Sequence, residues 1–348
     1  MNADSQSHVL RELTEQDHSR WDAYVEKTPA ASFFHRAGWQ WVIEDSFSHK
    51  TYYVYTERAG AMTGVLPLVH INSRLFGSAL ISIPFGVYGG PVADDASAMG
   101  LLDAHALELA KRLNVDYVEY RSLAPTRPDW LCRSDLYFTF RRAIETDPEK
   151  NLKAIPRKQR AVVRQSLEKG LDAVVEDTVD HVYAVYAESV RNLGTPVFSK
   201  RYFRNLKKVF GKDCELLSIQ KDGRPVSGVL SFYFRDEVLP YYGGGTFDAR
   251  KLGANDFMYW DLMRRAGQAG CRVFDFGRSK AGTGAYSFKK NWGFTAAPLH
   301  YEYRLCGIDS IPEHNPLNPK YRLMIAAWKR LPLPIANTLG PFIVRNLG

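Results

Sequence analysis

Residues 273–294 read VFDFGRSKAGTGAYSFKKNWGF, and the interpretation of the whole chain starts from this stretch. An apolar run typical of a strand is followed by a loop rich in glycine, serine and lysine, and then by an aromatic and cationic segment. Glycines in the loop permit positive φ and close approach to the backbone. Cations at positions 278, 280, 289 and 290 lie close to that backbone. The order indicates a site for an anionic or carbonyl-bearing ligand, with a solvated basic surface loop as the alternative.

The start of this stretch repeats an earlier part of the chain. GVL occurs at 64–66 and 228–230, YGG at 88–90 and 242–244, and a strand ends in Arg-Ser at 121–122 and 278–279. A predicted helix separates the second and third landmarks in both halves. Three landmarks in the same order indicate an internal duplication. Because only the second copy continues into the glycine-rich loop, we expect the first copy to be structural or substrate-cradling.

Length and composition favour a folded two-domain protein. The chain has 348 residues, 45% of them apolar, which is ample for buried cores. We expect a first domain over residues 1–148, a second, catalytic domain over 149–308 and a proline-rich apolar tail over 309–348. The net charge of +8 favours polyanionic partners such as RNA, nucleotide-linked substrates or anionic lipid.

Cysteine use and hydropathy predict a cytoplasmic protein. The four cysteines are scattered and form no C-x-x-C pair, which favours reduced thiols over disulfides or a zinc site. The N-terminus lacks the pattern of a secretory signal, and no run of about twenty apolar residues occurs. The tail is interrupted by prolines and cannot span a bilayer as one helix. We expect it to pack onto the domains, with peripheral contact at the inner face of a membrane as the alternative.

A cationic ridge is predicted on the helix that begins near Pro156. Arg157, Arg160 and Arg164 recur at spacings of three and four and so share one face. They are candidates for non-specific contact with donor phosphates, and an ordinary solvated face is the alternative.

Several separated motifs together resemble the Fem-type peptidyl and aminoacyl transferases. They are IPRKQR at 155–160, YYGGG at 241–245, DFGRSK at 275–280 and GAYSFKKNWGF at 284–294. In detail they are most similar to the FemAB-related proteins of bacterial exopolysaccharide and PEP-CTERM sorting loci. The resemblance covers roughly residues 14–304. It implies an α+β fold of two tandem GNAT-like (acyl-CoA N-acyltransferase-like) domains, each a mixed, mostly antiparallel sheet flanked by helices.

The resemblance also implies roles for residues of the second copy. Lys289 matches the Phe-Lys position of the family and would stabilise the oxyanion formed when an amine attacks an ester carbonyl. Asp275 is the candidate general base. The expected substrate-binding residues are Tyr242, Arg278, Lys280, Tyr286, Phe288 and Trp292, with the two cations holding phosphate or carboxylate groups.

The donor remains open between aminoacyl-tRNA and acyl-CoA. Acyl-CoA-dependent relatives usually carry Arg/Gln-x-x-Gly-x-Gly/Ala before a helix whose amides hold the pyrophosphate. Here residues 250–255 read RKLGAN, so Arg250 is present but Asn255 replaces the final small residue, which weakens the case for CoA. No metal-ligand spacing and no bound cofactor are predicted.

The expected function is an N-acyltransferase or aminoacyltransferase that acts on an amine of a cell-envelope precursor, such as one of peptidoglycan or exopolysaccharide. Lipid-linked and free precursors both remain open as acceptors. The alternatives are an acyl-CoA-dependent N-acyltransferase and a catalytically silent protein that binds RNA or polysaccharide. The acceptor, the transferred group and the oligomeric state are not readable from the sequence.

Overall fold

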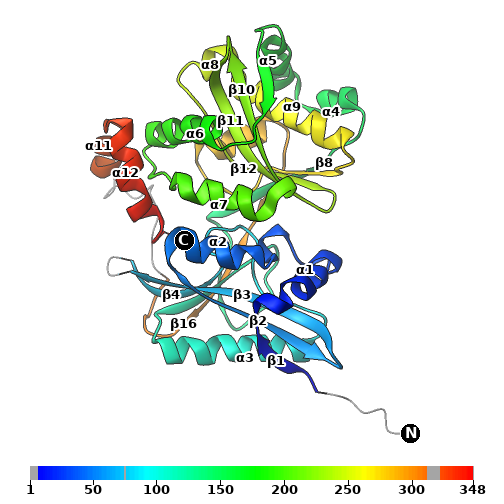
Figure 1. Ribbon diagram of the computed structural model, residues 1–348, viewed down its shortest axis with the longest axis vertical. Coiled ribbons are helices and arrows are strands. Elements are labelled where there is room, and N and C mark those ends of the chain that lie inside the picture. Colours follow the sequence, from blue (N-terminus) through cyan, green and yellow to red (C-terminus); the bar gives the residue numbers. More distant parts are fainter. Residues whose placement is uncertain (1–6, 74–75, 312–321, 348) are drawn as a thin grey trace. The chain divides into compact units, whose positions relative to one another are not determined.

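The computed structural model describes residues 7–73, 76–311 and 322–347. The chain divides into two compact units, each an α+β arrangement of one mixed sheet and its helices (Figure 1). Unit 1 comprises Met1–Ser134, Leu299–His314 and Asn346–Gly348, and unit 2 comprises Asp135–Pro298 and Asn315–Arg345.

The sheet of unit 1 has the order β1-β2-β3-β4-β6-β16-β7, and β5 adds to β3. Neighbours are antiparallel except for β4 and β6, which are parallel. Its strands are β1 (Val9–Glu12), β2 (Lys50–Arg58), β3 (Ala61–Ser73), β4 (Gly77–Ser82), β5 (Val92–Ala93), β6 (Tyr117–Ser122), β7 (Leu131–Arg133) and β16 (His300–Leu305).

Helices cover both faces of this sheet. Figure 1 shows α1 (His18–Lys27) and α2 (Gly38–Phe47) on one face and α3 (Ala96–Leu113) on the other. Leu102, Ala106 and Leu109 of α3 pack against Leu66 and Leu80 of the strands. Because β3 is covered on both faces, its residues 63–69 are all buried instead of alternating.

The sheet of unit 2 repeats this order as β9-β10-β11-β12-β13-β8-β14, and β15 adds to β8. Again one neighbouring pair, β12 and β13, is parallel. Its strands are β8 (Tyr137–Ala143), β9 (Asp172–Val175), β10 (Cys214–Lys221), β11 (Arg224–Phe234), β12 (Glu237–Gly245), β13 (Val273–Asp275), β14 (Ser279–Lys280) and β15 (Ala296–Pro298).

Adjacent glycines of β12 allow helices to approach both faces of the second sheet. Gly243 and Gly244 face opposite sides because side-chain directions alternate along a strand. A methyl group on Gly243 would lie 3.0 Å from the Tyr259 hydroxyl of α9 (Ala254–Gln268), and one on Gly244 would meet Ser189 of α6 (Asp180–Leu193).

The helices of unit 2 are α4 (Pro148–Ala154), α5 (Arg157–Leu167), α6 (Asp180–Leu193), α7 (Lys200–Phe210), α8 (Ala249–Leu252), α9 (Ala254–Gln268), α10 (Gly284–Asn291), α11 (Arg322–Trp328) and α12 (Leu333–Val344).

The predicted duplication and fold class are confirmed by the matching strand orders. GVL lies in β3 and in β11. The first Arg-Ser pair ends β6 and the second follows β13, and each of these strands follows a long helix and pairs in parallel with one neighbour. One detail was not anticipated: residues 284–291 form a helix, α10, whose first turn is capped by the Thr283 hydroxyl.

The larger part of unit 2, residues 135–298, is inserted into a hairpin of unit 1. Arg133 of β7 lies opposite Tyr301 of β16 in antiparallel pairing, and residues 135–298 lie between them in the chain. The insert enters through β8 and leaves through β15, which pair with each other. The two units thus differ from the expected ranges, since β8 lies before residue 148 and β16 lies after 298. Part of the expected tail, residues 312–321, lies outside the described residues.

This topology predicts how the chain can be divided. A chain in which Ser134 is joined directly to Leu299, ending at residue 311, keeps every strand of the first sheet and should unfold cooperatively. The fragment 1–148 lacks β16, so β6 becomes an exposed sheet edge, and it should aggregate or melt without cooperativity. Circular dichroism melting and size-exclusion chromatography compare the two. If the two fragments had the same melting and elution behaviour, the inference that residues 135–298 are inserted into a hairpin of unit 1 would be contradicted.

Candidate active site

The candidate site begins where two parallel strands separate. β12 and β13 pair only through Glu237–Val273 and Val238–Phe274. Beyond this point β12 continues to Gly245 along β11, whereas β13 continues along β8. A register shift between Leu230 and Ser231 of β11 lies opposite the same part of β12. The described pairing therefore opens a gap at the carboxyl ends of the two strands, the edge of an α/β sheet at which ligands commonly bind.

Lys289 of α10 organises the loop that follows β13. Its ammonium group donates to three successive carbonyl oxygens, at 2.6 Å to Phe276, 2.9 Å to Gly277 and 3.2 Å to Arg278. The side chain is 9% exposed and lies over the rings of Phe140 and Phe276. Burial lowers the pKa of Lys289 to about 7, although the nearby Asp275 carboxylate acts in the opposite direction. The site therefore holds a lysine that changes charge near neutral pH.

Asp275 fixes the same loop from within the strand. It is completely buried, and its Oδ1 accepts hydrogen bonds from the Gly277 amide at 2.7 Å and the Thr139 hydroxyl at 3.3 Å. Its other oxygen lies 3.6 Å from the guanidinium of Arg141. Gly277 has φ +64°, so glycine is favoured at this turn. Asp275 is thus positioned to shape the loop, and direct proton transfer to a substrate would require access that its burial denies.

Arg278 and Lys280 share one aromatic platform. The Arg278 guanidinium lies 4.7 Å and the Lys280 ammonium 5.5 Å from the ring centroid of Tyr137 on β8. Both residues are partly exposed, although the Nζ atom of Lys280 is itself buried. Ser279 between them is buried, and its hydroxyl has no hydrogen-bond partner among the described residues. This segment therefore gathers two cations and a donor hydroxyl, a combination that suits an anionic ligand.

The corresponding place in unit 1 is closed by its own chain. Arg121 is 3% exposed and donates to the carbonyl oxygens of Pro84 and Gly86 and to Glu119. The amides of Gly89 and Gly90 bind the Arg121 carbonyl. All these contacts are internal to unit 1, so the arginine there is structural. The two copies differ in the described residues as the sequence comparison indicated.

The aromatic residues after the loop lie at different depths. Tyr286 packs edge-on against Phe138 and Phe140 and is partly exposed. Phe288 contacts Tyr259 and Trp292. Trp292 is completely buried, and its indole N–H donates to Asp256 at 3.0 Å. Because Trp292 is buried, it can influence a substrate only through the groups that it contacts.

Tyr242 belongs to an aromatic cluster on the α6 side of the sheet. Its hydroxyl lies 3.1 Å from that of Tyr202, and its ring contacts Tyr186, Phe198 and Phe203. Burial raises the pKa of Tyr242 well above its ordinary value, so the phenol stays neutral. Tyr242 and Lys289 are not joined by any contact among the described residues.

Tyr259 of α9 lies across the gap and was not a candidate from sequence. Its ring is 4.9 Å from that of Phe276, which follows β13, and its hydroxyl lies beside Gly243 of β12. Burial raises the pKa of Tyr259 to about 12. The phenol therefore keeps its proton at neutral pH and can act as a donor. In the sequence this residue lies in a predicted helix after the YYGGG cluster, and no motif there assigns chemistry to it.

The first turn of α9 is occupied by side chains of unit 2. A methyl group on Gly253 would meet Ser166 of α5 at 3.2 Å, so α5 packs closely over this helix start. The Asn255 carboxamide accepts from Ser227 at 2.6 Å. Asp256 accepts from Gln159 of α5 as well as from Trp292, and burial raises its pKa. A helix start with a carboxyl group and a covering helix is poorly suited to a pyrophosphate.

The arginines that are expected to bind donor phosphates lie on two helices, α5 and α8. Arg157 and Arg164 are exposed on α5, while Arg160 is partly buried and donates to the Lys153 carbonyl. Arg250 is exposed on α8. The predicted helical ridge on α5 is present, and its contact with a donor stays a prediction.

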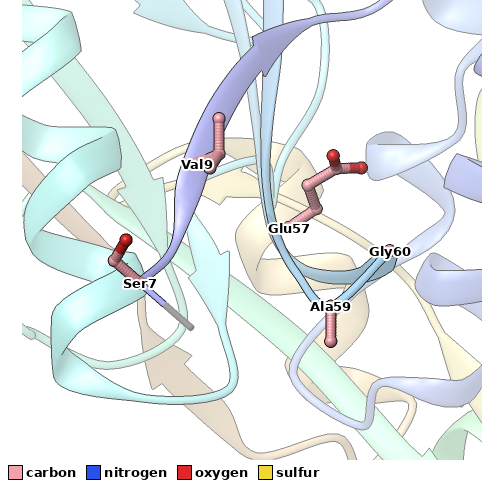
Figure 2. A pocket seen from close by; sticks show the side chains of 5 residues that line it. All are labelled: Ser7, Val9, Glu57, Ala59 and Gly60. Atoms are coloured by element: carbon pink, nitrogen blue, oxygen red, sulfur yellow. The ribbon is translucent and has the colours of Figure 1, made fainter. Parts of the chain in front are cut away.

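The other candidate site considered in the described residues is less suited to catalysis. An open hollow of about 540 Å³ in unit 1 is lined by Ser7, Val9, Glu57, Ala59 and Gly60 (Figure 2). Its carboxylate, Glu57, already pairs with Arg11 and Arg20. Over the described ranges no group of histidine, cysteine and acidic side chains is arranged to hold a metal. All four cysteines are free thiols.

Comparison with known proteins identifies the fold. Residues 153–290 match the family model described as an acetyltransferase (GNAT) domain. The chain is also similar to the crystal structure of FemX, with 15% identity, a TM-score of 0.69, and coverage of 91% of this chain and 100% of that one. A search of curated proteins finds no match.

Further solved structures share the architecture. A tandem GNAT protein from the clavulanic acid biosynthesis pathway aligns with 12% identity and a TM-score of 0.53, over 87% of this chain and 100% of that one. The C-terminal domain of a putative lysylphosphatidylglycerol synthetase from Agrobacterium fabrum aligns with 14% identity and a TM-score of 0.55, over 83% and 91%. The chain therefore has the tandem GNAT-like fold that is found in FemX, and the family-model match lies in its second unit.

The shifted ionisation of Lys289 predicts a pH-dependent stability. Between about pH 7 and the ordinary lysine value of 10.5, the unfolded lysine binds a proton and the folded one does not. Stability therefore rises with pH in this window. The melting temperature of the wild type relative to Lys289→Met should increase from pH 7 to pH 10 and stay constant below pH 7.

The exposed neighbour on the same helix supplies the control. Lys290→Met removes a lysine that lies over the Tyr286 ring and is open to solvent. A difference between wild type and Lys289→Met that does not change with pH would contradict the shifted pKa of Lys289.

Proposed function

We propose that the protein is a transferase that moves an acyl or aminoacyl group from an activated carboxyl donor to an amine of a cell-envelope precursor. The observation that carries this proposal is the buried Lys289 ammonium, which is held by three successive carbonyl groups of the loop after β13. A cation held in a dry site is worth more to a developing oxyanion than one in water. The GNAT family match over residues 153–290 supports the same class of reaction.

Lys289 would act through its most weakly held hydrogen bond. Two of its bonds, to Phe276 and Gly277, are short and buried, whereas the bond to the Arg278 carbonyl is 3.2 Å long and only partly buried. When an amine attacks the donor ester, the carbonyl oxygen gains negative charge. Exchange of this third bond for the oxyanion would stabilise the tetrahedral intermediate without moving the lysine. Asp275 would act as a positioning residue that holds the loop and favours the charged lysine.

The remaining groups fit binding and proton transfer. The amine must lose a proton and the leaving oxygen must gain one. Tyr259 keeps its proton at neutral pH and lies at the gap, so we assign it the donor role toward the leaving oxygen. The phenolate that results would take up the proton that the attacking amine releases, which restores the neutral tyrosine. Arg278, Lys280 and Ser279 would bind an anionic part of the donor or acceptor. Tyr242, Tyr286, Phe288 and Trp292 would shape or support the acceptor region.

The donor is better explained as aminoacyl-tRNA than as acyl-CoA. The start of α9, which would hold a pyrophosphate, is packed under Ser166 and carries the Asp256 carboxyl group. Arg157, Arg160 and Arg164 on α5 offer contacts to nucleic-acid phosphates without sequence readout. Association with exopolysaccharide or PEP-CTERM loci, and action at the cytoplasmic side of the membrane, rest on the sequence motifs alone.

Transfer of label from tRNA tests the catalytic assignment. Purified protein is incubated with tRNA charged with labelled amino acids and with an envelope-precursor extract, and label in the precursor fraction is counted. Lys289→Met should lower the rate by about 100-fold or more, because one oxyanion donor is worth that much. Lys290→Met should transfer at the wild-type rate. Wild-type activity in Lys289→Met would exclude an oxyanion role for this lysine.

The same assay tests Tyr259. Tyr259→Phe keeps the ring contacts with Phe276 and Phe288 but removes the proton donor, so the rate should fall by about 100-fold with little change in melting temperature. Tyr183→Phe, which removes a hydroxyl bonded to the Phe198 carbonyl, is the matched control.

Thermal-shift measurements distinguish the donors. Charged tRNA should stabilise the protein and acetyl-CoA should not. Stabilisation by acetyl-CoA alone would establish the acyl-CoA alternative, and binding of RNA without any transfer would favour the non-catalytic reading.

A further inference from the structure

The last two helices of the described chain pack on unit 2 through small residues. Trp328 of α11 donates its indole N–H to the Thr195 carbonyl at 3.2 Å, just after α6. In α12, Ala336 and Gly340 are buried, and a methyl group on Gly340 would lie 2.8 Å from the Val197 amide nitrogen. Figure 1 shows both helices, in red, at the α6 end of unit 2. The expectation that the tail packs onto its domain holds for these residues.

The same helices expose large apolar side chains. Ile335, Leu339 and Phe342 recur at spacings of four and three, so they form one stripe of α12. Their exposed fractions are 45%, 46% and 66%, and on α11 those of Leu323 and Met324 are 87% and 63%. These five residues are called the C-terminal apolar surface below. A soluble surface rarely concentrates so many exposed large apolar residues within two short helices.

The charges within these two helices and the segments that join and follow them have one sign. Residues 322–347 contain four basic residues, at positions 322, 329, 330 and 345, and neither aspartate nor glutamate. Lys329 and Arg330 are exposed in the turn between the two helices. Basic residues beside an apolar helix face are typical of helices that lie in the interface of an anionic bilayer.

We propose that the C-terminal apolar surface docks this protein on the surface of a membrane that contains anionic lipid. No helix in the described ranges combines the length and apolarity needed to cross a bilayer, so the contact is peripheral. The apolar side chains enter the acyl boundary while Lys329 and Arg330 meet lipid phosphates. A second copy of the chain is a poorer occupant, because a twofold contact through this surface would bring the basic residues of both copies together.

Vesicle flotation tests this proposal with the full chain. The wild type should float with vesicles of phosphatidylcholine and phosphatidylserine, and salt should weaken the binding. Ile335→Glu/Leu339→Glu should lower partitioning by at least about tenfold, because two apolar side chains no longer enter the lipid. Lys329→Gln/Arg330→Gln should lower it by roughly 20-fold on anionic vesicles and leave the weak binding to pure phosphatidylcholine unchanged.

A matched variant controls for added charge. Val9 and Leu131 in unit 1 are exposed to 47% and 51%, close to the values of Ile335 and Leu339. Val9→Glu/Leu131→Glu should therefore float like the wild type, and all variants should keep the wild-type melting temperature. Equal flotation of the wild type and Ile335→Glu/Leu339→Glu, or failure of the wild type to float, would overturn the proposal. So would a dimer in lipid-free sedimentation equilibrium that Ile335→Glu/Leu339→Glu abolishes. Transfer activity on a water-soluble acceptor is independent of all these outcomes.

Discussion

The buried ammonium group of Lys289 is the interaction on which the candidate site depends. It draws together three successive carbonyl groups after β13, and it does so from a helix that begins only a few residues later. A buried cation must be compensated by polar partners, so this lysine and its loop determine each other's geometry. Asp275 completes the arrangement by binding the Gly277 amide from the other side of the turn. The loop is thus rigid at the point where the strands part, and the charge at its centre is poised near neutral pH.

The two units share one fold, but only the second contains the residues of the candidate site. Both units use the same strand order and one parallel pair, yet the arginine at the end of the parallel strand has different surroundings. In unit 1, Arg121 donates hydrogen bonds to carbonyl groups of its own unit. In unit 2, Arg278 lies on the Tyr137 ring and is partly exposed. In unit 2 the loop carbonyls are bound instead by Lys289.

Much of the fold was predictable because it depends on local patterns and on the repeat. The pairing of β10 and β11, for example, is local: Asp222-Gly223 form the turn between the two strands, and both residues have positive φ. For the candidate site, the sequence predicted the segment in which it lies, residues 273–294, but not its contacts. That Lys289 donates to three carbonyls, that Tyr259 crosses the gap and that Asp256 binds Gln159 and Trp292 all depend on contacts between distant residues. Periodicity gives the face of a helix but not the partner that this face meets, so the sequence did not indicate that Tyr259 lies across the gap.

The hairpin that contains unit 2 has a consequence for how the protein is made. During synthesis β6 and β7 leave the ribosome long before β16, which both of them pair with. Until residue 305 has emerged, the nascent first sheet has an open edge, while the inserted unit, whose strands β8 to β15 are contiguous in the chain, can already close. Maturation would therefore run from the inside of the chain outward. The second sheet, beside which the proposed chemistry lies, would be complete before the first sheet gains β16, and α11 and α12 would be added to unit 2 afterwards.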